Sequence, residues 1–297
     1  MKHIGGQAVI EGVMMRSPGA WTVAVRGPDK EIFLKKKSIR ALPKIFKKPV
    51  LRGFIALAEA LVIGIKALTF SSEKAVEDEE KLSSFSMGMT VFVSFALGIL
   101  LFVLLPLYGT KLLGAVFQSI AESSLVFNFV DGIIRIIFFL AYILSMNFSK
   151  DIRRVFEYHG AEHKTVHAYE AGVELTPQNI DNYSITHPRC GTSFLIIVMI
   201  LSILIFSFIP RDWSFTWKFL SRIILLPLVA GISYEFVKFS SKNMGNPFVR
   251  ALTAPGIWLQ RLTAREPSLD QIEVAVEALK EVIKMDPAMK RKEEGNS

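Results

Sequence analysis

Long apolar runs separated by charged segments dominate the hydrophobic pattern of this chain. A helix that crosses a membrane needs about 20 consecutive, mainly apolar residues, and four runs approach that length. They occupy residues 89–108, 129–146, 194–208 and 219–237, and the third is the shortest. Together with an apolar content of 51%, this pattern predicts a mainly α-helical, polytopic membrane protein with about four transmembrane helices.

A fifth apolar run, residues 51–70, is ambiguous. It carries Glu59 and Lys66, and Arg52 stands at its start. If it crossed the membrane, the 12 basic residues of 1–52 would lie outside, against the tendency of Lys and Arg to remain on the cytoplasmic side. We therefore interpret this run as an interfacial or re-entrant helix, with a spanning helix as the alternative.

Lysine and arginine are distributed unevenly among the segments between the apolar runs. Segments 1–87, 149–192 and 239–297 hold 15, 5 and 9 of them, whereas 109–128 and 210–218 hold 1 and 2. This bias predicts a multi-pass protein of the cell membrane, with both termini and the 149–192 segment in the cytoplasm. The net charge of +8 then reflects sidedness and contact with the lipid bilayer, so nucleic acid is not expected as a partner.

These boundaries divide the chain into six regions. They are a cytoplasmic region with a β-hairpin (1–50), an interfacial helix with an acidic linker (51–87), a transmembrane hairpin (88–148), a cytoplasmic His-rich helix and loop (149–192), a second transmembrane hairpin (193–238) and a cytoplasmic C-terminal region (239–297).

The polar regions predict a small cytoplasmic α/β part. Residues 21–26 and 31–35 alternate apolar and polar side chains around a Gly-Pro-Asp-Lys turn, which is typical of a β-hairpin, and residues 7–15 add a strand. A capping-box sequence at 268–271 begins an amphipathic helix. Its apolar face is suited to docking or dimerisation, which makes a second copy of the chain or another membrane protein a candidate partner.

A cluster of histidines carries the strongest chemical signal. Residues 149–172 predict a helix with a serine at its start and a glycine at its end. At 100° per residue, His159 and His163 lie about 40° apart on one helical face, with Glu162 beside them. This face continues the apolar stripe of the helix, and a bound cation is one way to offset the cost of burying such groups. The order His-x-x-Glu-His also occurs in inverted zinc peptidases.

His187 and Cys190 stand directly before the third apolar run. A His-x-x-Cys turn can offer an imidazole and a thiolate to one soft or borderline cation. With His159 and His163 they would complete a closed tetrahedral zinc site. Three ligands with a free position would instead make a catalytic site, with Glu162 as the base. A metal-free polar network and a cysteine nucleophile served by His187 are the alternatives.

Ionisable residues within the apolar runs are further candidates for function. Asp131 and Arg135 are one helical turn apart and are expected to pair, whereas Arg222 is expected to extend toward the membrane surface. Glu235 stands near the cytoplasmic end of the fourth run. It is either an additional metal ligand or a side chain that extends toward Lys238.

Four motifs in order along the chain resemble the bacterial YqhQ family. They are GGQAVIEGVMMR (5–16), YHGAEHK (158–164), HPRCGT (187–192) and APGIWLQ (254–260). That family is a domain of unknown function whose members are described as predicted metal-dependent enzymes of the membrane, and the resemblance extends over nearly the whole chain. It implies a place in the bacterial inner membrane and draws attention to Glu11 and Arg16. Glu11 could approach the cluster as a ligand or as a carboxylate that supports a ligand.

The leading hypothesis from the sequence is a metal-dependent hydrolase at the cytoplasmic membrane surface. The expected ligands of zinc or a similar divalent ion are His159, His163 and His187, together with Cys190 or Glu235. Glu162 would be the general base in hydrolysis of a peptide or ester bond. The alternative is a non-catalytic membrane scaffold with a structural metal site. A transporter is disfavoured, because polar residues are sparse within the apolar runs and no inverted repeat is evident.

Overall fold

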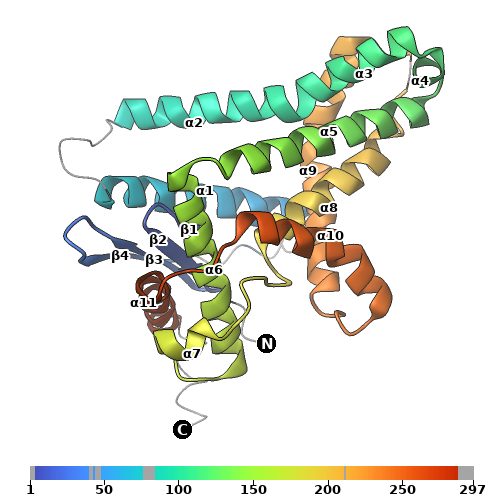
Figure 1. Ribbon diagram of the computed structural model, residues 1–297. Coiled ribbons are helices and arrows are strands. Elements are labelled where there is room, and N and C mark those ends of the chain that lie inside the picture. The colour runs from blue at the N-terminus through green and yellow to red at the C-terminus, as the bar shows by residue number, and fades with distance from the viewer. Residues whose placement is uncertain (1–3, 40–42, 44–47, 76–83, 211, 287–297) are drawn as a thin grey trace.

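The computed structural model describes residues 4–39, 43, 48–75, 84–210 and 212–286. Long apolar helices occupy the upper and right parts of Figure 1, and a small sheet with its covering helices occupies the lower left. This arrangement confirms the expected mainly α-helical class with a small α/β part. The acidic linker expected in 51–87 falls largely on residues 76–83, outside the described residues.

The sheet is an antiparallel meander in the order β1-β2-β3-β4. Its strands are β1 (Gly5–Val9), β2 (Gly12–Arg16), β3 (Ala20–Arg26) and β4 (Ile32–Ser38). The hairpin predicted around residues 27–30 is confirmed as β3 and β4. The single strand expected in 7–15 is instead a hairpin, because the chain reverses at residues 10–11, where Glu11 has a φ of 50°.

Helices cover both faces of the sheet. On one face, α1 (Leu51–Lys74) places Ala67 and Phe70 against the apolar side chains of β2 and β3. On the other face, α6 (Lys150–Ala171) and α11 (Leu269–Met285) enclose a second apolar core. The α/β part is thus built from segments that are far apart in the sequence, as Figure 1 shows.

Helix α11 begins with the predicted capping box between Ser268 and Gln271. The apolar face that was expected to dock or dimerise is buried, and Ile272, Leu279 and Val282 are each 0% exposed. It packs on the sheet and on α6 of the same chain. The docking is therefore intramolecular, and this face is covered rather than free for a second copy.

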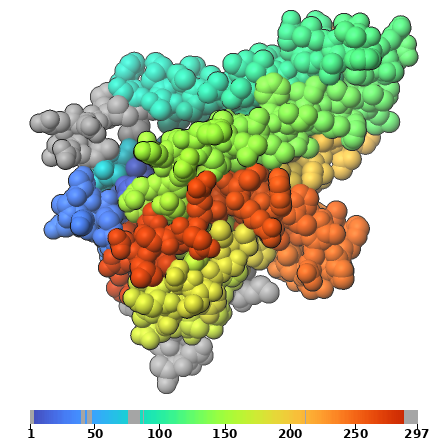
Figure 2. All heavy atoms as spheres, in the orientation of Figure 1, coloured from blue at the N-terminus to red at the C-terminus, as the bar shows by residue number. Residues whose placement is uncertain are grey.

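The apolar helices form two groups along the chain, one before α6 and one after it. They are α2 (Ser84–Ile99), a π-helical turn η3 (Leu100–Leu104), α3 (Leu105–Val116), α4 (Gln118–Glu122), α5 (Ser124–Met146), α8 (Gly191–Phe206) and α9 (Phe215–Ser240). Helix α10 (Pro247–Thr263) packs beside α8, and in Figure 2 its orange and red surface lies directly below the green surface of α5.

Four described helices are long and apolar enough to cross a membrane. They are α1, the continuous helix Gly88–Val116, α5 and α9. The count of four agrees with the sequence prediction, but the set differs. The third predicted span corresponds to α8, whose 16 residues rise only about 24 Å at about 1.5 Å per residue, less than the roughly 30 Å of a hydrocarbon core.

Helix α1 meets the length and composition of a membrane span, although the charge pattern predicts an interfacial position. Its C-terminal half covers the sheet, whereas Leu57, Leu61 and Leu68 on its opposite side are 38%, 46% and 44% exposed. A helix with one apolar side on protein and one facing outward can lie in the membrane surface. The interfacial position therefore stays our prediction for α1.

A buried cluster of charged residues connects three apolar helices. Arg135 pairs with Asp131 at 2.7 Å, as predicted, and donates to Ser202 of α8 at 2.8 Å. The prediction that Arg222 extends to the membrane surface is wrong. Its side chain is fully buried, donates to Asn128 at 2.9 Å and lies 3.3 Å from Asp131. Packing of α9 against α5 and α8 offers Arg222 these internal partners, which a single helix cannot provide.

The segment that joins α10 to α11 crosses α6 in close contact. A Cβ atom at Gly160 would lie 1.9 Å from the carbonyl oxygen of Arg265, whose N–H donates to Phe156 at 2.9 Å. The ammonium group of Lys164, a residue only 3% exposed, pairs with Glu266 at 2.6 Å. Gly160 therefore allows the main chain at Arg265 to approach the main chain of α6. The hydrogen bond to Phe156 and the ion pair of Lys164 stabilise this contact.

We expect Gly160→Ala to destabilise the protein by about 1–3 kcal/mol. Alanine favours helices over glycine by about 1 kcal/mol, but the backbone at Arg265 would have to move. Thermal unfolding in detergent would measure the effect. Gly98→Ala in α2 is the matched control, because a Cβ there meets nothing within 4 Å. Equal melting temperatures for the two variants would contradict this account.

The charge distribution also predicts the sidedness of the loops. Alkaline phosphatase fused after Gly172 should be inactive, because the enzyme needs an oxidising compartment for its disulfides. The same enzyme fused after Glu122 in α4 should be active. Activity after Gly172 would overturn the predicted orientation.

Candidate metal centre

Helix α6 carries three of the predicted site residues. The side chain of Ser149 caps its N-terminus by accepting from Ile152, and Gly172 ends it in a left-handed conformation with a φ of 74°. Both ends lie where the sequence predicts them. This register puts His159 and His163 one turn apart on the side of α6 that faces the start of α8.

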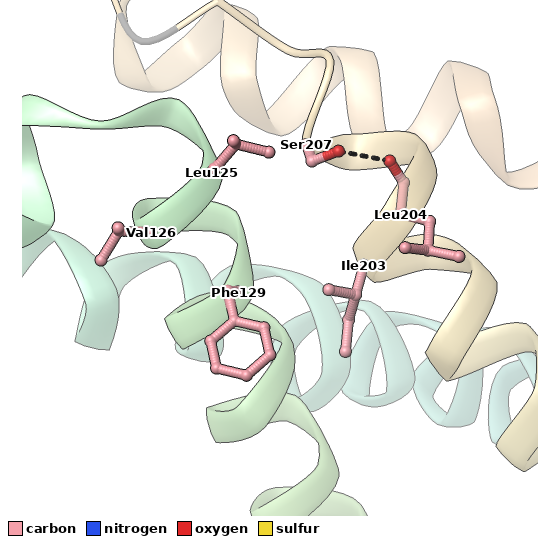
Figure 3. A pocket seen from close by; sticks show the side chains of 6 residues that line it. All are labelled: Leu125, Val126, Phe129, Ile203, Leu204 and Ser207. Carbon is pink, nitrogen blue, oxygen red and sulfur yellow. Dashed lines mark hydrogen bonds between the residues drawn. The ribbon is translucent and has the colours of Figure 1, made fainter.

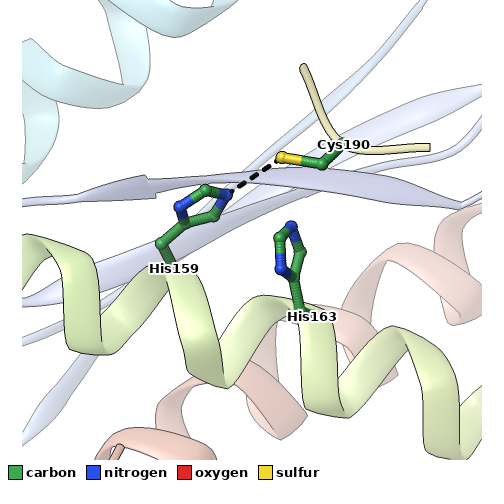
Figure 4. A group of neighbouring side chains, drawn as sticks. All are labelled: His159, His163 and Cys190. Carbon is green, nitrogen blue, oxygen red and sulfur yellow. Dashed lines mark hydrogen bonds between the residues drawn. The ribbon is translucent and has the colours of Figure 1, made fainter. Parts of the chain in front are cut away.

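His159, His163 and Cys190 form a compact group. Their nearest ligand atoms all lie within 4.8 Å of one another, and His159 Nε2 is 3.2 Å from Cys190 Sγ. Figure 4 shows both imidazole rings directed toward the sulfur, which comes from the residue that precedes α8. Zinc bonds to nitrogen at about 2.0 Å and to sulfur at about 2.3 Å, which at a tetrahedral angle holds the two atoms roughly 3.5 Å apart. The separation of His159 Nε2 and Cys190 Sγ therefore fits a zinc-like cation.

Main-chain carbonyl groups fix both ligand rings. His159 Nδ1 lies 2.7 Å from the carbonyl oxygen of Thr263, and His163 Nδ1 lies 2.5 Å from that of Ile185. Because a carbonyl oxygen only accepts hydrogen bonds, each Nδ1 carries a proton, and in the neutral imidazole each Nε2 keeps its lone pair. His163 Nε2 is buried without a hydrogen-bond partner among the described residues. Histidines that bind metals typically have this arrangement.

His187 lies next to the group but is oriented differently. Its Nδ1 accepts a hydrogen bond from the Arg189 N–H at 3.2 Å, so the proton is on Nε2, which lies 3.6 Å from Glu170. Burial lowers the pKa of His187, although the nearby Glu162 carboxylate opposes this shift. The structure therefore brings His187 beside the three ligand candidates, without a lone pair directed at them.

Glu162 lies at the edge of the group, under strand β1. Its side chain is 8% exposed, and Oε2 is 3.4 Å from His163 Nε2. A Cβ atom at Gly6 would lie 2.7 Å from Glu162 Cγ. The glycine of the first motif thus allows β1 to cover a carboxylate that would otherwise be pushed away from the imidazole.

The other charged residues of the first motif connect elements. Glu11 is paired with the guanidinium of Arg154 at 2.6 Å and lies 3.3 Å from the Tyr158 hydroxyl. Arg16 forms an ion pair with Glu59 of α1. The structure therefore places Glu11 outside the metal-type group, where with Arg16 it ties the sheet to α6 and α1.

Glu235 is engaged at the junction of α1 and α9. Both its oxygens accept hydrogen bonds from Arg52, one of them from Nε at 2.6 Å. The carboxylate is not part of the group formed by His159, His163 and Cys190. The basic residue at the start of the ambiguous apolar run is thus the partner of Glu235.

Two residues of α10 support the site without having been predicted. Gln260, which is 0% exposed, accepts from the His187 N–H at 2.7 Å and donates to its carbonyl at 2.9 Å. The same amide donates to Ser193 at 2.8 Å. Thr263 supplies the carbonyl for His159. The APGIWLQ motif contains Gln260, but no local pattern indicates which loop its amide binds.

An apolar groove of about 330 Å³ lies elsewhere, between α5 and α8 (Figure 3). It is lined by Leu125, Val126, Phe129, Ile203, Leu204 and Ser207. Its one hydroxyl group already donates to a main-chain carbonyl at 2.5 Å. This groove offers no group that could act on a substrate, so the candidate site is the His-Cys group.

Comparison with known proteins agrees with the four motifs. The family model described as "Protein of unknown function (DUF1385)" matches residues 48–285. This chain belongs to that family. It is also 35% identical to "Uncharacterized protein YqhQ" of Bacillus subtilis (strain 168), an alignment that covers 95% of this chain and 92% of the relative. No solved structure matches the chain.

Replacement of Gln260 tests whether α10 holds the His187–Cys190 turn. Gln260→Leu would leave the buried His187 N–H unsatisfied, at a cost of about 1–3 kcal/mol. It would also remove one of the two hydrogen bonds to the His187 carbonyl, which still accepts from the Cys190 N–H at 3.2 Å. We expect a lower melting temperature in detergent and weaker zinc binding in competition with a chelator. Gln178→Leu, at an exposed position, should change neither. Unchanged zinc binding in the Gln260 variant would contradict this role.

Proposed function

We propose that this protein is a metal-dependent hydrolase, with zinc as the best-fitting ion and His159, His163 and Cys190 as its ligands. The observation that carries the proposal is the convergence of two imidazole lone pairs on one sulfur, with Glu162 beside them. Three protein ligands leave a coordination position open, which is typical of catalytic rather than structural zinc sites.

Bound zinc would act as a Lewis acid that polarises the carbonyl group of the substrate. Glu162 would take a proton from the attacking water, whose oxygen bonds to the carbonyl carbon. The bond from that carbon to the leaving nitrogen or oxygen breaks, and Glu162 returns the proton to the leaving group. His187, whose Nε2 faces Glu170, borders the site and is not required as a ligand.

The site is proposed to act at the cytoplasmic membrane surface. Helix α6 begins four residues after α5 ends at Met146, and Cys190 directly precedes the apolar helix α8. The ligands are thus tied to helices that can enter a bilayer. The positive charge of the neighbouring loops supports the cytoplasmic side.

A second candidate function is nucleophilic catalysis by Cys190 with His159 as its base. His159 Nε2 lies 3.2 Å from Cys190 Sγ, within reach for taking the thiol proton. The Thr263 carbonyl orients the same imidazole through Nδ1, as the third group of a catalytic triad does. This differs from the sequence-based alternative, in which His187 served the cysteine. A non-catalytic scaffold with a structural metal site is the third possibility, and it would not need Glu162.

Substitutions in the group separate these functions. The metal proposal predicts that His159→Ala, His163→Ala and Cys190→Ser each lower the zinc content of the purified protein at least about tenfold. Catalysis by a cysteine nucleophile would instead require His159 and Cys190 for activity, and it would not require His163. Zinc content by elemental analysis is the measurement, and wild-type protein without bound metal would exclude both metal-based functions.

Glu162→Gln tests catalysis directly. This variant should keep its zinc and lose hydrolytic activity by about 10²–10⁴-fold, since the amide cannot accept the proton. Loss of the ability to restore a deletion strain is the cellular readout. Glu174→Gln, at an exposed position one turn beyond α6, is the control. Full complementation by Glu162→Gln would end the hydrolase proposal.

A further inference from the structure

The two edge strands of the sheet are built differently. Strand β4 contains Lys35, Lys36 and Lys37, whereas β1 has the sequence Gly-Gly-Gln-Ala-Val. Proteins commonly protect exposed strand edges with charges, proline or bulges, because an open edge pairs with other chains. Strand β1 has none of these features, and its first three residues are exposed.

The register determines which main-chain groups β1 presents outward. The Arg26 N–H donates to the Glu11 carbonyl at 2.8 Å, so the facing pair Gly12 and Val25 does not exchange hydrogen bonds. The main chain of Gly12 therefore turns toward β1, where its partner is Val9. By alternation, Gly6 and Ala8 direct their N–H and C=O groups away from β2.

The outward edge of β1 has no hydrogen-bond partner in the described part of the chain. No residue there donates to or accepts from the outward main-chain groups of Gly6 and Ala8. The space beside Gly5 is also free, since a Cβ atom at this position would meet nothing within 4 Å. These four main-chain groups thus have no hydrogen-bond partner in the described part of the chain, and they are the groups that an incoming strand would pair with.

This edge borders the candidate metal centre. Gly6 is in contact with Glu162, and Glu162 Oε2 is 3.4 Å from His163. An added strand lies about 4.8 Å from its neighbour in a sheet. A chain paired with β1 at Gly6 and Ala8 would therefore run past the carboxylate that we propose as the base.

We propose that the substrate is a polypeptide segment that binds in extended form by pairing with the free edge of β1. The N–H and C=O groups of Gly6 and Ala8 match the repeating polarity of a peptide backbone, which a small ester or amide lacks. Pairing places successive peptide bonds of the segment next to Glu162. Cleavage of the bound segment rests on the proposed hydrolase function, whereas binding does not.

Binding can be measured without catalysis in zinc-loaded Glu162→Gln protein in detergent. The probe is fluorescein-labelled, reduced and carboxymethylated α-lactalbumin, an unfolded polypeptide, and the readout is fluorescence anisotropy. Ala8→Pro removes one outward N–H at a position where an edge strand tolerates proline. Ala8→Ser keeps that N–H and is the matched control. We expect Ala8→Pro to weaken binding about tenfold and Ala8→Ser to leave it unchanged.

Hydrogen exchange on the protein without a change at Ala8 gives a second measurement, which stays decisive if Ala8→Pro does not fold. Added polypeptide should slow exchange at the amides of Gly6 and Ala8 and not at the outer edge of β4. Equal binding by both Ala8 variants, no slowing at these two amides, or no binding of the probe would overturn the edge proposal. Binding without cleavage by the unsubstituted protein would overturn only the hydrolase function.

Discussion

Close packing around α6 is the constraint on which the candidate site depends. Strand β1 approaches this helix through Gly6, and the segment after α10 approaches it through Gly160. Interiors pack at nearly crystalline density, so a methyl group at such a contact must displace backbone. Displacement near Gly160 would also move Thr263, whose carbonyl fixes His159. The two glycines thereby connect helix packing to the orientation of an imidazole.

The ligand geometry is set mainly by backbone atoms. Carbonyl groups of Thr263 and Ile185 hold the two rings, and Cys190 occupies the cap position of α8. Thr263 is the last residue of α10, whereas Ile185 and Cys190 belong to the one segment that leads into α8. A main-chain acceptor specifies the histidine tautomer whatever side chain the residue carries. The arrangement therefore makes the site a product of the whole fold.

Features governed by neighbouring residues could be predicted from the sequence. The ends of α6 follow from a serine cap and a left-handed glycine, and the start of α11 follows from its capping box. The burial of Arg222 could not be predicted, because Asp131 and Asn128 reach it from another helix. Gln260 was missed for the same reason, since its amide binds the main chain of His187, 73 residues away.

The sequence alone determined the mainly helical class with apolar helices long enough to cross a membrane, the family, and the spacing of His159 and His163. Periodicity, composition and motifs are properties of local segments. The tertiary structure decided that Cys190 joins these histidines while His187, Glu11 and Glu235 take other partners. It also decided that β1 ends the sheet beside Glu162. Which side chains converge depends on the packing of distant segments. The direction of the hydrogen bonds then decides which of the converging histidines can direct a lone pair at a metal.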